Sequence, residues 1–304
     1  MLLLSGNKPF NRKQNCIMNE LLKKTADVVR SAEIDISFTI LEVGALSVGS
    51  TEPFYELLDY FPSSRIIGFE IDEHVCTKMN SESREGVEYF PFALGAYNRE
   101  VPLYVTNHPM CTSLYKPNEK LISLYHNFEV AYLKSIEKVR TTQLDVFLQT
   151  QNIDKVDFIK IDVQGAELDI FKGGQKALND VLKIVCEVEF VPHYENQPLF
   201  GDVCNFLAKK DLMFNKFLGL AGRSLKPIVM NNNKNLPSQH IWSDAVYIKH
   251  VQKIPQLNDS DLIKLALLAA TYGSADLVHY CLSFYDKNNP HTTISNTWLE
   301  TILT

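Results

Sequence analysis

The sequence predicts an α/β protein whose core is a doubly wound, mostly parallel β-sheet. From about Ile36 onward, short apolar runs alternate with helical patterns, as expected for successive βαβ units. The first of these runs ends in a glycine turn, and several of the others end in an acidic residue. Parallel strands require crossover connections, and right-handed crossovers cover both faces of the sheet with helices.

Five segments are predicted to form parallel strands, because each is a short apolar run with β-branched or aromatic residues. They are residues 37–43, 65–71, 87–94, 155–163 and 182–190. Three intervening segments have the length and polarity of one crossover helix each. They are residues 51–61, 72–82 and 166–180.

Two further strands are predicted after the fifth. Residues 198–211 have a helical pattern, and the apolar runs 212–219 and 243–250 follow, joined by a long polar loop. Two late strands with such a connection favour an antiparallel hairpin at the edge of the sheet. The asparagine-rich stretch 231–235 within the loop indicates an exposed connection.

Helical segments flank this core on both sides. Residues 15–33 have the pattern of one amphipathic helix, whose buried stripe is expected to consist of Ile17, Leu21, Leu22, Val28 and Val29. Residues 259–284 have the pattern of a helical hairpin. We predict that Asp259 or Ser260 caps its first helix, that Gly273 ends this helix, and that Ser274 starts the second. The sequence does not decide whether these helices pack on the core or contact a second copy of the chain.

The composition is that of an ordinary globular protein. With 45% hydrophobic and 22% charged residues, it argues against disorder, collagen or a disulfide scaffold. The 304 residues include 30 basic and 36 acidic side chains, a net charge of -6, without a basic cluster. A general nucleic-acid binder is therefore not expected.

Cysteine spacing and the start of the chain indicate the compartment. The six cysteines form no CxxC pair, which favours free thiols in a reducing compartment over a zinc site or a disulfide framework. The initial three-leucine run is shorter than the apolar stretch of a signal peptide. No segment approaches the roughly 20 apolar residues of a membrane span. We therefore expect a cytoplasmic protein.

The glycine turn after the first strand is a candidate cofactor loop. Gly44 lets the backbone turn sharply and approach a ligand closely. A dinucleotide loop would need GxGxxG, and a Walker loop a lysine after its second glycine, but here Gly44 and Gly49 are followed by Ser50. No basic residue occurs between residues 41 and 64. Glu42 suits S-adenosylmethionine, which is cationic and has no phosphate.

Carboxylates also end the second and fourth predicted strands. Glu70 could accept hydrogen bonds from both hydroxyls of a ribose. An acidic residue after a strand is more often a helix cap or a solvated charge, so this interpretation depends on Glu42 and Gly44 before it. Asp162 follows the apolar run 158–161, which presents its carboxylate from a buried strand to the ligand cleft.

Five stretches stand out together: ILEVGA, GFEID, EYFPFALG, VDFIKIDVQGAELDIFKGG and EVEFVPHYENQPLF. Over about residues 36–250 they resemble the FkbM family of S-adenosylmethionine-dependent methyltransferases, and IKIDVQGAE is the most specific part. The resemblance implies a class I methyltransferase (Rossmann-like) fold with a seven-stranded sheet, and O-methylation of sugars or natural products. The family's first motif is closer to DVGANIG, whereas this chain has Glu42 for the aspartate and one more residue before Gly49.

The resemblance also implies roles for individual residues. Its cofactor-binding positions correspond to Glu42, Gly44, Ala45, Glu70, Ile71, Phe92, Ala93, Leu94 and Asp162. Among these, Glu70 resembles the ribose-binding acid, and residues 92–94 resemble the wall beside the adenine. Asp162 resembles the acidic position that faces the methyl donor and the acceptor. Its motif is completed by Gln164, Gly165 and Glu167.

Methyl transfer to a hydroxyl needs alignment, exclusion of water and a group that takes the acceptor's proton. His, Asp or Glu suits this role, and the candidates at the strand ends are Asp162, Glu189 and His193. The loop 108–114 resembles a family segment near the acceptor. The three candidates could in principle hold a divalent metal, but their spacing does not require one, so no metal site is predicted.

The sequence therefore predicts a cytoplasmic S-adenosylmethionine-dependent methyltransferase that acts on a hydroxyl of a sugar or small natural product. The expected division is an N-terminal helical segment, a methyltransferase domain and a C-terminal helical hairpin, at residues 1–35, 36–250 and 251–304. The alternatives are an NAD-dependent oxidoreductase and a non-catalytic scaffold that keeps the fold. The expected partner is the small-molecule acceptor, a homodimer stays open, and neither nucleic acid nor a membrane span is expected.

Overall fold

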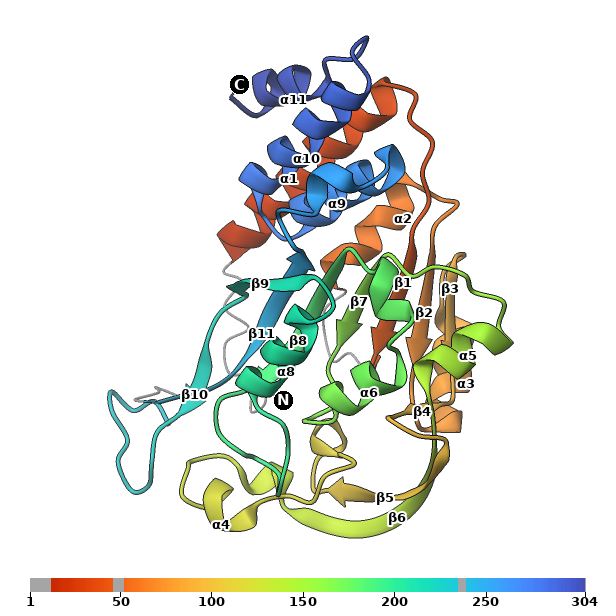
Figure 1. Cartoon of the computed structure of the whole chain (residues 1–304). Helices are drawn as coiled ribbons and strands as arrows, with labels where there is room; N and C mark the ends of the chain where they lie inside the picture. Colours follow the sequence, from red (N-terminus) through yellow and green to blue (C-terminus); the bar gives the residue numbers. More distant parts are fainter. Residues whose placement is uncertain (1–11, 46–51, 235–238, 304) are drawn as a thin grey trace.

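The computed structural model describes residues 12–45, 52–234 and 239–303 (Figure 1). Within them, the central sheet has eight strands. Five strands pair parallel, namely β1 (Thr39–Val43), β2 (Arg65–Phe69), β3 (Val87–Phe90), β7 (Phe158–Ile161) and β8 (Lys183–Glu189). Antiparallel pairing adds β9 (Leu212–Phe217), β10 (Ala221–Arg223) and β11 (Gln239–Lys249).

The strand order is β10-β11-β8-β7-β1-β2-β3, and β9 also pairs with β11. The predicted α/β class and the mostly parallel sheet are confirmed. The predicted number of seven strands is wrong, because the described residues form eight. The additional strand, β10, pairs with the first residues of β11, whereas β9 pairs with the last ones.

The predicted strand 87–94 is interrupted at Pro91, which is a second correction. Proline has no N–H to donate to a strand ladder, and the next N–H, of Phe92, turns back to the carbonyl oxygen of Phe90 at 2.9 Å. Residues beyond the interruption form β4 (Ala93–Leu94), which belongs to a separate sheet. That sheet has the order β4-β6-β5, with β6 (Leu133–Thr142) and β5 (Arg99–Thr106).

Short helices connect the parallel strands. The predicted helix 51–61 consists of a 3-10 turn, η1 (Pro53–Glu56), that continues into α2 (Leu57–Tyr60). The predicted helix 166–180 is divided into α6 (Glu167–Gly173) and α7 (Ala177–Asp180), because two successive glycines, weak helix formers, end the first part. The predicted helices 72–82 and 198–211 are α3 (Glu73–Glu82) and α8 (Phe200–Ala208).

The remaining short elements lie around the second sheet and before the C-terminal helices. They are η2 (Pro109–Cys111), α4 (Glu119–Ile122), η3 (Glu129–Ala131), α5 (Leu144–Thr150) and η4 (Ile254–Gln256). Alternate side chains of the buried strands enter two apolar cores, one on each face of the central sheet. Ile40 and Phe158 belong to one core, and Leu41 and Ile161 to the other.

The flanking helices complete the first of these cores. They are α1 (Arg12–Ser31), α9 (Asp259–Thr271), α10 (Ala275–Asn288) and α11 (Ile294–Leu303), which lie together at the top of Figure 1. The Nε1 of Trp298 donates to the Oγ1 of Thr25 at 2.9 Å, which ties α11 to α1. The Nζ of Lys264 on α9 donates to the Asp157 carboxylate at the start of β7 at 3.0 Å. These helices therefore pack on the core, which is one of the two arrangements that the sequence left open.

The predicted helical hairpin is confirmed as α9 and α10, with Gly273 in the turn at φ +68° and Ser274 as the second N-cap. Asp259 and Ser260 are not the first cap. That residue is Asn258, whose side chain accepts from the N–H of Asp261. The predicted stripe of α1 is buried at the four described side chains, and the side chain of Ile17 lies outside the described part.

No helix in the described ranges combines the length and the apolar character needed to cross a membrane.

Candidate functional site

Acidic side chains from neighbouring strands gather at one edge of the central sheet. β1, β2, β7 and β8 are mutually parallel, so their carboxyl ends meet at that edge. Glu42 lies on β1, Glu70 follows β2 and Asp162 follows β7. Glu187 and Glu189 lie at the end of β8. This carboxyl edge faces the second sheet at the bottom of Figure 1.

The Glu42 carboxylate is buried and held by a pair of tyrosines. The hydroxyl of Tyr55 donates to its Oε2 at 2.6 Å, and the hydroxyls of Tyr55 and Tyr89 are 2.8 Å apart. Burial and the Glu42 charge raise the pKa of Tyr55 above its usual value, so the phenol keeps its proton and remains a donor. The predicted residue is thus a fixed, buried acceptor.

Gly44 brings the end of β1 against the end of β7. Its φ is +81°, and a Cβ built on it would lie 1.9 Å from the carbonyl oxygen of Asp162. A side chain there would force the two strand ends apart. The next residue, Ala45, is buried, and its N–H donates to the carbonyl oxygen of Phe69 at 3.1 Å. Gly49 lies outside the described residues.

Glu70 and Asp72, two residues apart, have different tasks. Asp72 caps α3, because its carboxylate accepts from the N–H groups of His74 and Val75. Glu70 accepts from the N–H of Asp72 at 3.0 Å, and burial raises its pKa despite that bond. Glu70, rather than Asp72, is therefore the carboxylate presented at the end of β2. Its neighbour Ile71 is exposed.

Residues 92–94 lie beside an aromatic cluster at the same edge. The Phe92 ring is half-buried and contacts Phe147 edge to face, with ring centroids 5.5 Å apart. Phe147 also contacts Phe69 and Phe90, at 4.7 and 5.0 Å. Ala93 and Leu94 are buried behind them. The cluster forms an apolar wall next to Glu70.

Gln164 joins two carboxylates. Its Nε2 donates to Asp162 Oδ1 at 2.8 Å and to Glu187 Oε2 at 2.6 Å. The backbone of Gln164 is in the left-handed region, at φ +57°, and its carbonyl oxygen accepts from the Ser113 hydroxyl at 2.7 Å. The hydroxyl of Tyr194 lies 3.2 Å from Gln164 Oε1. The predicted acceptor loop 108–114 therefore contacts the Asp162 motif.

Burial perturbs the acids around this cluster. It raises the pKa of Glu187 and of Glu189 well above the usual range, and the nearby Asp162 charge adds to both effects. Burial raises the pKa of Glu167 to about 7, although its carboxylate accepts from the N–H groups of Val163 and Gly165. The carboxyls of Glu167, Glu187 and Glu189 therefore hold a proton more tightly than ordinary carboxyls do.

Lys160 supplies a buried cation on the same face of the sheet. Its Nζ donates to the Asp244 carboxylate at 2.9 Å. Burial alone would lower the pKa of Lys160, but the carboxylates of Asp244, Asp162 and Glu52 raise it well above its usual value. The lysine is thus charged and already engaged by carboxylates.

His193 lies apart from the carboxylates. Its ring contacts Phe128 and Trp242, with centroids 5.1 and 6.0 Å away, and its Nε2 has no hydrogen-bond partner among the described residues. Burial and the Arg223 guanidinium lower the pKa of His193 to about 3, so the imidazole is neutral and weakly basic. The charge of Asp162 acts on Glu189, whereas neither carboxylate is among the groups that perturb His193.

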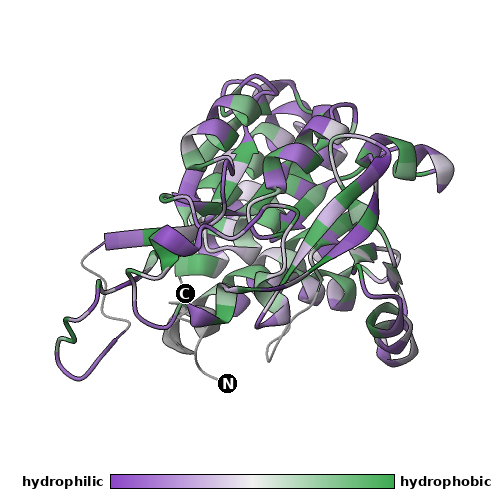
Figure 2. Cartoon of the chain, turned by 90° about the horizontal axis from the view of Figure 1, so that it is seen from below, coloured by the Kyte–Doolittle hydropathy of each residue, from purple (hydrophilic) through white to green (hydrophobic). Residues whose placement is uncertain are grey.

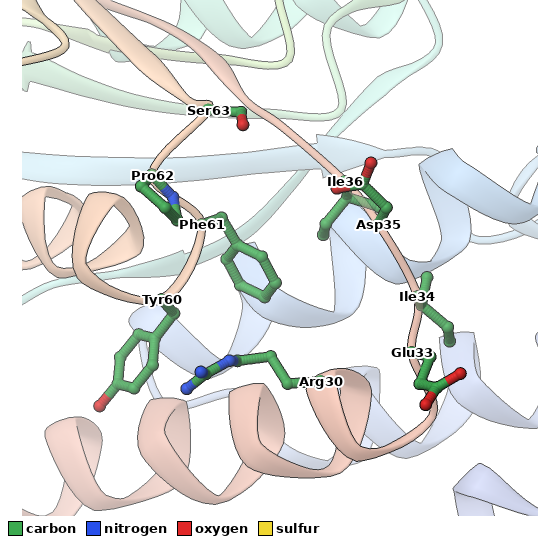
Figure 3. A pocket seen from close by; sticks show the side chains of 9 residues that line it. All are labelled: Arg30, Glu33, Ile34, Asp35, Ile36, Tyr60, Phe61, Pro62 and Ser63. Carbon is green, nitrogen blue, oxygen red and sulfur yellow. The ribbon is translucent and has the colours of Figure 1, made fainter.

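No group of three or more His, Cys, Asp or Glu side chains in the described part of the chain has the arrangement of a metal site. A surface pocket of about 260 Å³ lies at the opposite edge of the sheet, where β1 and β2 begin (Figure 3). It is lined by Arg30, residues 33–36 and residues 60–63, and contains none of the predicted site residues.

Sequence analysis missed three contributors to the site, Tyr55, Lys160 and Glu187. A signal for Glu187 exists in the stretch KIVCEVEF, where two acids alternate with apolar residues on a buried strand. Alternation places both acids on one face of the sheet. No comparable signal marks Tyr55, because its contact with Glu42 depends on the tertiary fold.

Comparison with known proteins identifies the family of this chain. The model of the family described as methyltransferase FkbM domain matches residues 42–214. No curated protein matches the chain significantly. A crystal structure from Thermobifida fusca YX, described as that of a candidate methyltransferase, is similar at 11% identity and a TM-score of 0.35, over 78% of this chain and 82% of that chain. That structural likeness is too low to carry an argument. The family model, which spans more than half of the chain, identifies it as a member of the FkbM methyltransferase domain family.

Proposed function

We propose that the chain is an S-adenosylmethionine-dependent methyltransferase that acts on a hydroxyl group of a sugar or small natural product. Family membership supports methyl transfer in general. The observation that carries the proposal is the set of carboxylates at the carboxyl edge, in which Gln164 joins Asp162 to Glu187 beside the Gly44 turn.

The chemistry of this donor set fits S-adenosylmethionine. The ligand carries a sulfonium and an ammonium group but no phosphate, and Glu42, Glu70 and Asp162 are acidic. Lys160, the buried cation beside them, is engaged by Asp244. A pyrophosphate would meet net negative charge at this edge, which disfavours the NAD-dependent alternative. Glu70 would hold the ribose hydroxyls, and residues 92–94 would lie beside the adenine.

When bound, S-adenosylmethionine would supply a methyl carbon already activated by its sulfonium. The protein must then orient the acceptor, exclude water and take the hydroxyl proton. We assign the last role to the pair of Asp162 and Glu187. Gln164 donates one N–H to each carboxyl, which fixes the pair, and burial disfavours two full charges on it. Glu189 stays a second candidate, whereas the weak basicity of His193 disfavours it as the base.

We also propose the finer features of the fold. The strand order β3-β2-β1-β7-β8-β11, with β11 antiparallel, supports a class I methyltransferase fold of Rossmann-like type. In this proposal residues 36–250 form the methyltransferase domain, and residues 1–35 and 251–304 form flanks that pack on it.

Calorimetric titration with S-adenosylmethionine tests the cofactor assignment. Glu70→Ala should weaken binding at least tenfold, because a hydrogen bond to a charged group contributes about 1.5–3 kcal/mol. Glu82→Ala is the matched control, since this exposed glutamate at the end of α3 has no assigned role, and it should bind as tightly as wild type. Absence of binding by the wild type, or equal binding by Glu70→Ala, would reject the proposal and favour a non-catalytic scaffold.

Turnover tests the assignment of the base, once a methyl-transfer screen over hydroxylated sugars has found an acceptor. Asp162→Asn and Glu187→Gln should each lower kcat by a factor of about 100 or more, and Glu187→Gln should leave cofactor affinity within about threefold. His193→Ala should lower kcat less than either. Unchanged kcat in both carboxyl variants would remove the pair from the mechanism.

A further inference from the structure

An exposed apolar surface projects from the connection between β10 and β11. Four apolar side chains of this connection and one of the segment hydrogen-bonded to it are 39 to 61% exposed, and we call these five the apolar tip. They are Leu124, Leu225, Ile228, Val229 and Met230. All residues from 225 to 234 are exposed. Soluble proteins seldom expose so many neighbouring apolar side chains without a partner.

The backbone holds the apolar tip in a defined conformation. The N–H of Lys226 donates to the carbonyl oxygen of Leu124 at 2.8 Å, and that of His126 to the carbonyl oxygen of Ser224 at 3.1 Å. A β-bridge between Tyr125 and Leu225 lies between these bonds. The segment before Phe128 therefore supports the tip from one side, and its apolar side chains face solvent.

The tip is convex. In Figure 1 residues 224–234 extend away from the body of the molecule at the lower left, and in Figure 2, seen from below, they again project at the left with apolar stretches along them. A peptide or helix of a partner protein is usually bound in a groove or along a sheet edge. A projecting apolar loop instead suits insertion into the soft surface of a lipid layer.

Charge favours a lipid surface of negative sign. Residues 224–234 include Lys226 and Lys234 and no acidic residue, although the whole chain has a net charge of -6. Lys226 also pairs with Glu129, but an exposed ion pair contributes little to stability, so the lysine can exchange Glu129 for a lipid phosphate. Lysines beside an apolar tip lie at the depth of the headgroups when the tip is inserted.

The apolar tip leaves the molecule at the edge that carries the candidate site. β11 runs antiparallel to β8 and pairs Trp242 with Glu189, so its first residue lies at the carboxyl edge. β10 ends at the same place, because Arg223 pairs with Gln239. A surface that contacts the tip would therefore face the edge where Asp162 and Glu187 lie.

We propose that the apolar tip inserts into an anionic lipid bilayer and that the acceptor hydroxyl belongs to a lipid or lipid-linked molecule in that bilayer. The second part rests on the proposed function, because it names the acceptor class of the same site. The first part depends only on the tip and its lysines. Binding to the bilayer is peripheral, through a few side chains, and therefore reversible.

Sedimentation with vesicles tests the insertion on the full chain without cofactor. The probes are vesicles of phosphatidylcholine and of equal parts phosphatidylcholine and phosphatidylglycerol. Wild type should pellet with the mixed vesicles and about tenfold less with pure phosphatidylcholine. The double variant Ile228→Ser with Met230→Ser should bind at least tenfold more weakly. Leu303→Ser, at an exposed leucine on α11, is the control and should bind as wild type.

A fluorescence measurement identifies the contact itself. In the variant Ile228→Trp, emission should shift to shorter wavelength with the mixed vesicles and be quenched by brominated lipid chains. Wild type that stays in the supernatant, or equal pelleting of wild type and the double variant, would overturn the proposal. So would self-association that the double variant abolishes without any vesicle binding, since the tip would then contact a second copy.

The outcome is separable from that of the proposed function. All tip variants should bind S-adenosylmethionine as wild type does, so calorimetry reports the cofactor site and sedimentation reports the tip. If a lipid hydroxyl is the acceptor, the double variant should methylate a vesicle-bound acceptor at least tenfold more slowly than wild type does. It should methylate the same acceptor dispersed in detergent at the wild-type rate. An equal fall in the methylation rate on both forms of the acceptor would refute the lipid acceptor but not the proposed methyl transfer.

Discussion

Replacing Gly44 by alanine should both destabilise the protein and weaken binding of the methyl donor. Two costs add. A non-glycine residue in the left-handed region, here at φ +81°, costs about 1–2 kcal/mol. The new Cβ would lie 1.9 Å from the Asp162 carbonyl oxygen, so one strand end must move by about 1.1 Å to reach a 3.0 Å contact. Such overpacking costs about 1–3 kcal/mol.

The sum of about 2–5 kcal/mol corresponds to a fall in Tm of roughly 4–10 °C, at about 2 °C per kcal/mol for a chain of this size. Thermal unfolding followed by circular dichroism measures it, and calorimetry should find S-adenosylmethionine binding at least tenfold weaker. Gly201→Ala is the matched control. No atom lies within 4 Å of its added Cβ, and its helical position should make the change neutral or slightly stabilising. Equal Tm and equal affinity in the two variants would refute the close approach of β1 to β7.

Three further substitutions test the buried polar groups. Tyr55→Phe removes a donor to Glu42 and should lower the free energy of unfolding by about 1.5–3 kcal/mol in urea titrations, whereas Tyr97→Phe, at an exposed tyrosine, should not. Glu167 has a folded-state pKa of about 7, above the ordinary 4.5, so the wild type should lose on the order of 3 kcal/mol of stability as pH rises between these values. Glu167→Gln should remove this part of the pH dependence in the same titrations, and an unchanged slope would exclude a contribution of Glu167. Burial lowers the pKa of Lys183 well below 10.5, so stability should instead rise with pH toward 10.5, and Lys183→Met should abolish the rise.

The parallel strands could be predicted closely because they are buried on both faces. β1, β2, β7 and β8 each begin and end within three residues of the predicted segments, since buried strands leave near-continuous apolar runs in a sequence. β6 left no such signal. Most of its side chains, such as Lys134 and Glu137, are exposed, and only its pairing with β5 and β4 defines it. Pro91 was visible in the sequence and marks the interruption that the prediction overlooked.

The site could be predicted only in part, because contacts between strands leave no signal in the order of residues along the chain. Residues at the ends of strands, such as Glu70 and Asp162, follow from the position of each strand along the chain. Contacts between strands depend on register. The alternation of Glu187 and Glu189 in β8 indicates a shared face, but only the pairing of β8 places Glu187 beside Asp162 and Asp244. The bridging role of Gln164 further depends on its left-handed backbone, which the residue type alone does not indicate.

The central claim is that the carboxyl edge of β1, β2 and β7 binds the methyl donor. A crystal structure of the full chain with S-adenosylhomocysteine tests it most directly, since this demethylated product of the methyl donor keeps the adenosine. The account predicts ribose hydroxyls within hydrogen-bond distance of the Glu70 carboxylate, with the adenine against Phe92. Adenosine bound elsewhere, for example in the pocket beside Arg30, or ribose hydroxyls remote from Glu70, would contradict it.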